Sequence, residues 1–150
     1  MNKLKYLGYA IVFQEVPNET TLTINISGCP YKCKGCHSKY LWEYKGNYIS
    51  DDMDNLLNKY DGLITCVCFM GGDQNIDELT HLMAHIRDKN LKICIYTGCE
   101  EKSVIEHLMT LCDYIKYGRY VENLTTDNNI QHGVKLATSN QKFIMKGIDY

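Results

Sequence analysis

Short apolar segments alternate with amphipathic helical segments through the middle of this chain, and this alternation restricts the fold more than any other feature. Polar and apolar residues alternate with period two over 21–27, which predicts a half-buried strand that ends at Gly28. Denser apolar runs over 63–70 and 91–96 predict strands covered on both faces, and 113–117 predicts a further strand. The sequence therefore predicts a series of about four strands.

Helical periodicity fills the intervals between these strands. A first helix is predicted to follow Ser50 as its N-cap, with two aspartates in its first turn. A second helix extends from Ile76 to about Asn90, and a third carries an apolar face from Val104 to Leu111. Strands that alternate with helices form right-handed βαβ units, so the chain is predicted to have an α/β fold with mostly parallel strands.

The length of the chain limits the number of these units. A barrel of eight βα units typically needs about 250 residues, whereas this chain has 150. About four to six units fit, which predicts a partial, open (β/α) barrel in which 1–150 form a single domain. Strand-like segments also lie at 6–13, 134–137 and 142–145, and the polar segment 120–133 is predicted to be a surface loop.

Charge and hydropathy exclude two classes of partner. The formal net charge is −2 and no segment gathers many Lys or Arg residues, so the chain lacks the basic surface that nucleic-acid binding requires. The apolar run over 9–13 is too short for a signal-peptide core or a membrane span. We therefore expect a cytoplasmic protein with no nucleic-acid or membrane partner. Its eight cysteines are then expected to be metal ligands or core residues, not disulfides.

Three cysteines form the strongest motif. Cys29, Cys33 and Cys36 give the spacing C-x3-C-x2-C directly after the first predicted strand. Three thiolates on one loop can hold three irons of a cubane, and Gly35 lets the backbone approach it closely. A zinc site is the alternative, but structural zinc takes four ligands, and the fourth would have to be His37. We therefore interpret the triplet as the ligand set of a [4Fe–4S] cluster with one open iron.

Two further motifs follow the next strands of the series. Gly71-Gly72-Asp73 comes after the run 63–70, and its glycines allow close approach to a ligand while its carboxylate can neutralise an ammonium group. By itself this pattern is more often an ordinary turn than a binding site. Thr97-Gly98 follows the run 91–96. Because parallel βα folds place these loops on one rim, the three motifs are expected to converge on one pocket.

The cysteine spacing resembles the signature of the radical S-adenosylmethionine superfamily, and Gly71-Gly72-Asp73 resembles its GGE-type motif. Within that superfamily the chain is most similar to activating proteins of anaerobic ribonucleoside-triphosphate reductases, in motifs that span most of its length. These are Ser27-Gly28-Cys29, Cys33-Lys34-Gly35-Cys36-His37, Gly71-Gly72-Asp73, Tyr96-Thr97-Gly98, Tyr117-Gly118-Arg119-Tyr120 and Ser139-Asn140-Gln141. The chain departs from the usual pattern at Gly35, where an aromatic residue is common, at Gln74 instead of Pro, and at Tyr117 instead of Asp.

The resemblance implies a fold, a reaction and its participants. The fold would be a partial barrel of the radical SAM type. A reduced [4Fe–4S] cluster would donate an electron to S-adenosyl-L-methionine, and the resulting 5′-deoxyadenosyl radical would remove a hydrogen atom from a glycine of the reductase. The partners would be that reductase and a low-potential electron donor such as flavodoxin or ferredoxin. The cluster ligands would be Cys29, Cys33 and Cys36, and the cofactor contacts would be Gly35, Cys36, His37, Gly71, Gly72, Asp73 and Thr97.

Other readings stay open from the residues alone. The chain could activate a different glycyl-radical enzyme, modify a small molecule, or act as a non-enzymatic iron–sulfur or zinc protein. The remaining cysteines are predicted to have structural roles. Cys66, Cys68 and Cys94 lie within predicted buried strands and are interpreted as core residues, whereas Cys99 and Cys112 lie at the ends of elements.

Overall fold

A seven-stranded mixed sheet forms the centre of the protein, in the order β3-β1-β2-β4-β5-β6-β9. The structure is a computed structural model that describes residues 2–36 and 38–150. Its strands are β1 (Lys5–Val12), β2 (Thr21–Ile26), β3 (Asn47–Tyr48), β4 (Cys66–Met70), β5 (Lys92–Thr97), β6 (Tyr114–Tyr117) and β9 (Lys142–Met145). The four central strands β2, β4, β5 and β6 are parallel, and antiparallel strands flank them on both sides.

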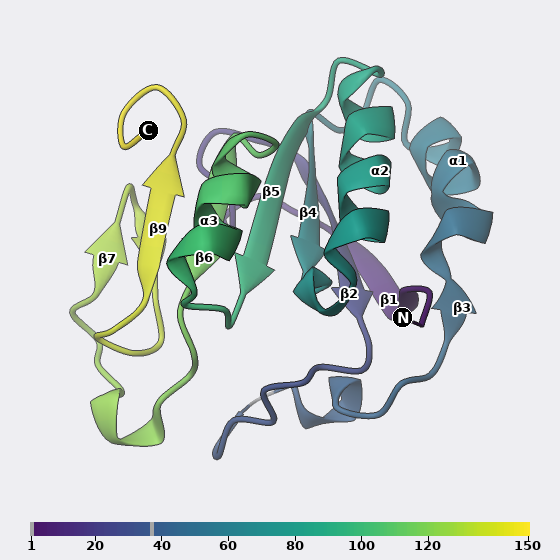
Figure 1. Cartoon of the computed structure of the whole chain (residues 1–150). Coiled ribbons are helices and arrows are strands. Elements are labelled where there is room, and N and C mark those ends of the chain that lie inside the picture. Colours follow the sequence, from purple (N-terminus) through teal and green to yellow (C-terminus); the bar gives the residue numbers. More distant parts are fainter. Residues whose placement is uncertain (1, 37) are drawn as a thin grey trace.

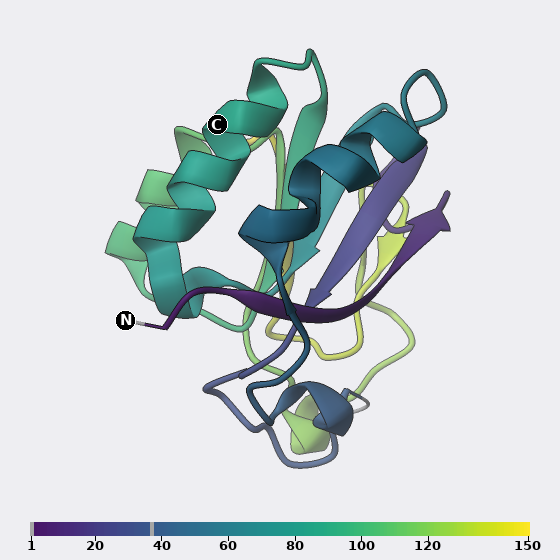
Figure 2. The ribbon, with the colours of Figure 1, turned by 90° about the vertical axis from the view of Figure 1, so that its right-hand side faces the viewer.

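Three helices cover one face of this sheet, as Figures 1 and 2 show. They are α1 (Ile49–Lys59), α2 (Ile76–Arg87) and α3 (Lys102–Met109). Shorter elements are the 3-10 turns η1 (Lys39–Leu41), η2 (Asp73–Asn75) and η3 (Glu122–Leu124), and the hairpin of β7 (Ile130–Gln131) and β8 (Val134–Lys135). Across the described residues, none of the helices combines the length and the apolar character needed to cross a bilayer.

The α/β class and the four parallel strands predicted from the alternating pattern are confirmed. The structure also assigns partners that the sequence left open: β1 pairs with β2, and β9 pairs with β6, both antiparallel. The expected four to six βα units are too many, because only three α-helices occur in the described part of the chain. The sheet is open, with β3 and β9 at its edges.

Two predicted boundaries are wrong for local reasons. Ser50 is not an N-cap but lies within α1, which begins one residue earlier. The first amide of the helix, at Ile49, donates to the carbonyl of Leu4 at 3.1 Å, so the neighbouring β1 segment satisfies it without a side-chain cap. The predicted strand over 63–70 starts only at Cys66, because the amide of Leu63 closes a turn onto Tyr60 instead.

The two faces of the central strands differ in chemistry. Toward the helices they present large apolar side chains, including Phe69, Ile93 and Ile95, which are all fully buried. Toward the other face they present Cys66, Cys68 and Cys94, packed with Tyr114, Val16, Val134, Leu136 and Phe143. Burial raises the pKa values of Cys66 and Cys94, which keeps these thiols neutral. The interpretation of these three cysteines as core residues is confirmed.

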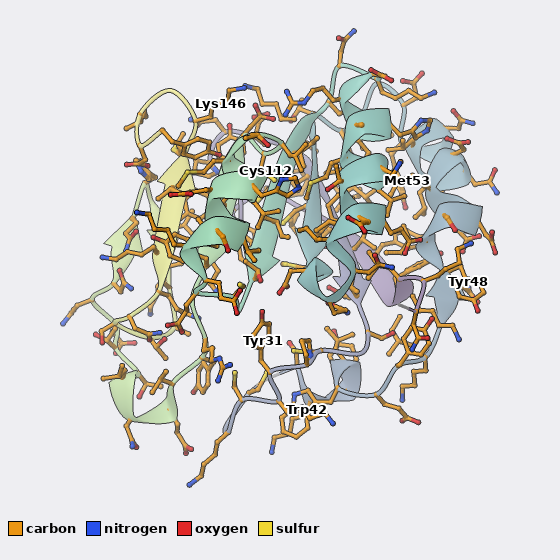
Figure 3. The ribbon with its side chains drawn as sticks, viewed as in Figure 1. Tyr31, Trp42, Tyr48, Met53, Cys112 and Lys146 are labelled. Atoms are coloured by element: carbon orange, nitrogen blue, oxygen red, sulfur yellow. The ribbon has the colours of Figure 1, made fainter. Side chains whose placement is uncertain are left out.

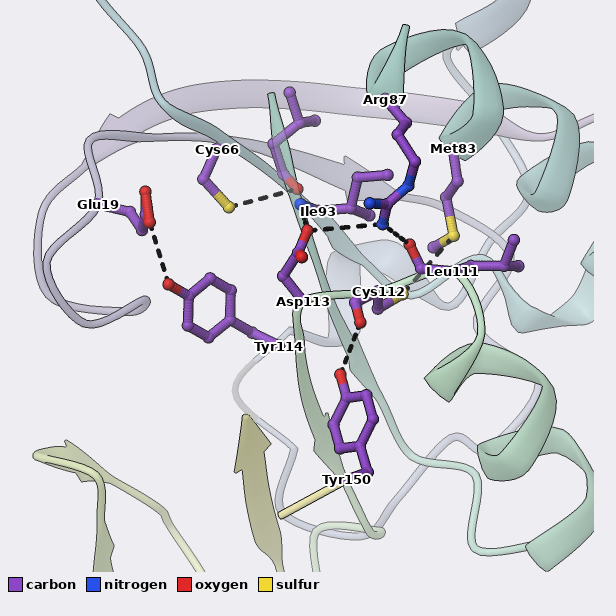
Figure 4. Close-up of polar contacts among 11 residues, drawn as sticks. Glu19, Cys66, Met83, Arg87, Ile93, Leu111, Cys112, Asp113, Tyr114 and Tyr150 are labelled. Carbon is purple, nitrogen blue, oxygen red and sulfur yellow. Dashed lines mark hydrogen bonds and ion pairs between the residues drawn. The ribbon is translucent and has the colours of Figure 1, made fainter. Parts of the chain in front are cut away.

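Polar contacts fasten the amino-terminal ends of β5 and β6 (Figure 4). Asp113 accepts a hydrogen bond from the amide of Ile93 at 3.0 Å and lies 3.6 Å from the guanidinium of Arg87 on α2. The hydroxyl of Tyr150 donates to the carbonyl of Cys112 at 2.7 Å, which brings the last residue of the chain against the start of β6. These contacts hold the end of the sheet opposite to the predicted pocket.

The packing of Cys68 yields a test of its role as a space-filling residue. Replacing Cys68 by Ala should lower the free energy of unfolding by about 1–2 kcal/mol, because it leaves a small cavity in a fully buried layer. Cys68→Val, which fills the cavity with an apolar side chain somewhat larger than that of cysteine, should cost less than about 1 kcal/mol. Urea denaturation of both variants measures the difference. Equal losses in the two variants would contradict a packing role.

Candidate functional site

A cavity of about 290 Å³ lies beyond the carboxyl ends of the four parallel strands. Figure 1 shows the loop that follows β2 crossing beneath the ends of β4 and β5. The lining includes residues from all three sequence motifs: Cys29, Cys33, Cys36, Gly71, Asp73, Thr97 and Gly98. The predicted convergence of the motifs is therefore confirmed. Of the other residues assigned by resemblance, Gly35 and Gly72 do not line this cavity, and His37 falls outside the described residues.

The cysteine loop is closed at its base by a buried serine. Ser27 donates from its hydroxyl to the carbonyl of Lys45 at 2.5 Å and accepts from the amide of the same residue at 3.1 Å. The amides of Gly28 and Cys29 then both donate to the carbonyl of Leu41, at 2.8 and 3.0 Å. Because Leu41 is buried, these bonds fix the start of the loop to the body of the protein.

The three motif cysteines are partly exposed and are not in disulfides. The amide of Cys36 donates to the carbonyl of Cys33 at 3.1 Å, which forms a tight turn between the second and third cysteines. The amide of Ser38 lies 3.4 Å from the sulfur of Cys36 and donates to it. Amide donors of this kind stabilise thiolates and tune iron–sulfur clusters. The loop therefore presents accessible thiols, of which at least one already has an amide partner.

The Gly-Gly-Asp turn needs both of its glycines. Gly71 and Gly72 have φ angles of 100° and 112°, in the left-handed region that side chains disfavour. A Cβ atom at Gly72 would also lie 2.8 Å from the side chain of Ile26. The glycine at this position lets the chain turn tightly against β2. The next residue, Asp73, consequently enters the cavity at the start of η2.

Two side chains from other motifs hold the carboxylate of Asp73. Tyr31 donates to one of its oxygens at 2.5 Å, and Thr97 donates to the other at 2.7 Å. The residue after it, Gln74, donates to the carbonyl of Ser27 at 3.0 Å. Gln74 thus links the turn to the base of the cysteine loop, a contact that the more common proline would not make.

Tyr31 connects the cysteine loop to the rim of the sheet, and sequence reasoning missed it. In Figure 3 its side chain extends from the loop toward the strands. A Cβ atom at Gly98 would lie 3.0 Å from its ring, and the guanidinium of Arg119 lies 5.2 Å from the ring centre. Burial, together with the hydrogen bond to Asp73, raises the pKa of Tyr31, so its hydroxyl stays a donor.

A single row of residues runs across the four parallel strands and lines the cavity. Asn25, Met70, Tyr96 and Lys116 are aligned by strand register, each beside the next. The ammonium group of Lys116 lies 5.5 Å from the centre of the Tyr96 ring. Burial lowers the pKa of Lys116, while nearby Cys33 and Cys36 act in the opposite direction. Sequence reasoning did not single out Lys116. The feature that could have identified it is a lysine within a segment predicted to be a buried strand.

The cavity continues into a second hollow of about 400 Å³ on the surface. Tyr31, Cys33 and Tyr120 line both of them. Lys32 and Lys34 of the cysteine loop form one side of the hollow, and the segment 119–123 forms the other. The site is therefore open toward solvent along the cysteine loop.

Comparison with known proteins identifies the family. A family model described as a 4Fe-4S single cluster domain matches residues 19–144. This chain belongs to the 4Fe-4S single cluster domain family. The family supports an iron–sulfur cluster in this protein, in agreement with the interpretation of the cysteine triplet. No solved structure matches the chain.

Two curated proteins resemble this member of the family. Both are named anaerobic ribonucleoside-triphosphate reductase-activating protein, one from Escherichia coli strain K12 and one from Escherichia coli O157:H7. Each is 26% identical over 128 residues, which cover 76% of this chain and 83% of the relative. The resemblance drawn from the motifs is thereby confirmed.

The donor set of the cavity fits the cluster of the 4Fe-4S single cluster domain family. Cys29, Cys33 and Cys36 line one cavity, yet no three His, Cys, Asp or Glu side chains within 2–36 and 38–150 are grouped to hold a single metal ion. A cubane spreads its cysteine sulfurs over a body several ångström wide, whereas zinc gathers four ligands around one atom. Three cysteines in one cavity supply the ligands for three irons of such a cubane.

The departure of this family member at Tyr117 has a structural explanation. Tyr117 packs against the helix-side core and does not line the cavity. In the register of β6, its neighbour Lys116 is the residue that faces the site. The polar group that this strand contributes to the cavity is therefore Lys116, one position before Tyr117.

The contact between Tyr31 and Asp73 can be measured as a coupling energy. A double-mutant cycle with Tyr31→Phe and Asp73→Asn should give a coupling of about 1.5 kcal/mol in the free energy of unfolding, because the bond joins a hydroxyl to a carboxylate. The matched control is Tyr44→Phe, whose hydroxyl donates to the carbonyl of Lys3 instead. Its coupling to Asp73→Asn should stay below about 0.5 kcal/mol. Similar couplings for both tyrosines would contradict the assigned contact.

Proposed function

We propose that this protein is a radical SAM activase that generates a glycyl radical on an anaerobic, class III ribonucleoside-triphosphate reductase. The observation that carries the proposal is the meeting of the cysteine triplet and the Gly-Gly-Asp turn in one cavity at the carboxyl ends of parallel strands. The similarity to the reductase-activating proteins of Escherichia coli supports the choice of partner. In this proposal residues 1–150 form one radical SAM domain, and the open sheet is its partial barrel.

Cys29, Cys33 and Cys36 are the proposed ligands of three irons of the cluster. Their thiols are accessible from one cavity, and the described chain offers no additional cysteine in its lining. The fourth iron would then be open to S-adenosyl-L-methionine. When bound, the cluster supplies one electron for cleavage of the cofactor to methionine and a 5′-deoxyadenosyl radical, which takes a hydrogen atom from the target glycine.

The protein's own groups would bind and orient the cofactor. Asp73 is proposed to receive its ammonium group, because this carboxylate lies in the cavity with its position fixed by Thr97 and Tyr31. Gly71, which lines the cavity, would let the cofactor approach the backbone. The proposed contacts are Gly35, Cys36, His37, Gly71, Gly72, Asp73 and Thr97.

The open side of the cavity suits a macromolecular substrate. The second hollow joins the cavity at Tyr31, Cys33 and Tyr120, so a loop of another protein has a path to the cluster. A sealed pocket would be expected for a small metabolite, since such sites bury most of the ligand surface. The electron is proposed to come from a low-potential donor such as flavodoxin or ferredoxin.

The ligand assignment predicts which cysteines control iron content. We expect a low iron content after anaerobic reconstitution of Cys29→Ala, Cys33→Ala or Cys36→Ala. Each variant should bind far less iron than a complete cubane, which contains about four irons per chain. Cys66→Ala is the control, because that thiol lies in the buried layer away from the cavity. It should keep its iron and lose only stability. Iron and sulfide assays with visible absorbance give the result, and a variant that retains the full cluster removes its cysteine from the ligand set.

The function itself predicts a radical on the reductase. The reduced protein, mixed anaerobically with S-adenosyl-L-methionine and the anaerobic reductase of its own source, should produce a glycyl radical seen by electron paramagnetic resonance. The control is the same reductase with its acceptor glycine changed to Ala. Formation of 5′-deoxyadenosine without a reductase radical would retain the chemistry and reject the partner. The absence of both products would instead favour a non-enzymatic iron–sulfur protein.

A further inference from the structure

Lys116 is the charged residue in the row of Asn25, Met70, Tyr96 and Lys116 that lines the cavity. It lies in β6, between β5 and β9 (Figure 1), and its register partners are Tyr96 on one side and Phe143 on the other. The residues on either side of it along β6, Ile115 and Tyr117, belong to the helix-side core. The alternation of the strand therefore directs the lysine to the same face as the cysteine loop.

The ammonium group of Lys116 has no acidic partner within the described chain. None of the ion pairs among residues 2–36 and 38–150 includes it, and its ammonium group lies over the ring of Tyr96. Asp73, the carboxylate that lines the same cavity, is already bonded to Tyr31 and Thr97. A partly buried charge without a partner costs stability, so its retention calls for an anion at this position.

We propose that Lys116 is the counter-charge of the cluster held by Cys29, Cys33 and Cys36. The inference rests on the proposed function. Three thiolates make the cluster site anionic, and reduction adds one electron, supplied by an external low-potential reductant, with no bond made or broken in the protein. An ammonium group in the cavity that Cys33 and Cys36 also line stabilises the reduced form more than the oxidised form. Lys116 thereby raises the reduction potential and makes the cluster easier to reduce.

The test is the reduction potential of the cluster in the absence of S-adenosyl-L-methionine. In anaerobic potentiometric titrations followed by electron paramagnetic resonance, Lys116→Met should lower the ratio of reduced to oxidised cluster at a fixed potential by about tenfold, equivalent to about 59 mV for one electron. Lys116→Arg should restore the wild-type value, because it keeps the charge. Lys142→Met removes an exposed lysine of the neighbouring strand β9 and should leave the potential unchanged.

The outcomes separate this inference from the proposed function. Wild-type protein that takes up no cluster would overturn both. If the cluster forms in Lys116→Met and its reduction potential is unchanged, the counter-charge proposal alone is overturned. If the potential is unchanged but the affinity for S-adenosyl-L-methionine falls, the lysine binds the cofactor carboxylate instead. If Lys116→Met fails to fold by circular dichroism, Lys116→Gln provides the same loss of charge in a polar side chain. A more negative potential in either neutral variant, restored by Arg, supports the proposal.

Discussion

The parallel, in-register pairing of β2, β4, β5 and β6 is the constraint on which the rest of the structure depends. Parallel strands end at the same edge, so the segments that follow β2, β4 and β5 must meet there. These segments contain the cysteine triplet, the Gly-Gly-Asp turn and Thr97. An antiparallel arrangement of the same strands would place the motifs at opposite ends of the sheet. The site is thus a consequence of strand direction.

The same register also sets apart two rows of residues on one face of the sheet: one row is buried in the core, and the other lines the cavity. The row that contains Cys68, Cys94 and Tyr114 is buried, and the next row toward the carboxyl ends contains Met70, Tyr96 and Lys116 and lines the cavity. Small thiol side chains in this row pack with aromatic rings such as Tyr114 and Phe143, and burial raises the pKa of the Cys94 thiol, which keeps it neutral. They contribute to packing, whereas the cysteines of the loop remain accessible.

Hydrogen bonds between loops determine the shape of the cavity. Asp73 joins the turn after β4 to Tyr31 in the cysteine loop and to Thr97 at the end of β5. Gln74 adds a bond to Ser27, which itself closes the base of the cysteine loop. The loop therefore has a defined position relative to the sheet through contacts of side chains that are far apart in the sequence. The two donors fix the position of this carboxylate at the cavity.

Local patterns in the sequence were sufficient to predict the α/β class, the four parallel strands and the meeting of the motifs, because hydrophobic period and turn residues act over a few positions. The start of α1 at Ile49 was missed because its first amide bonds to Leu4, the residue before β1, a contact without a local signal. The tertiary structure alone decided that β9 pairs with β6, that Tyr31 reaches Asp73 across 42 positions, and that β6 turns Lys116 toward the cavity. The physical reason is that strand partners and side-chain contacts depend on which distant segments pack together, whereas the tendency to form a strand, helix or turn is encoded in the neighbouring residues.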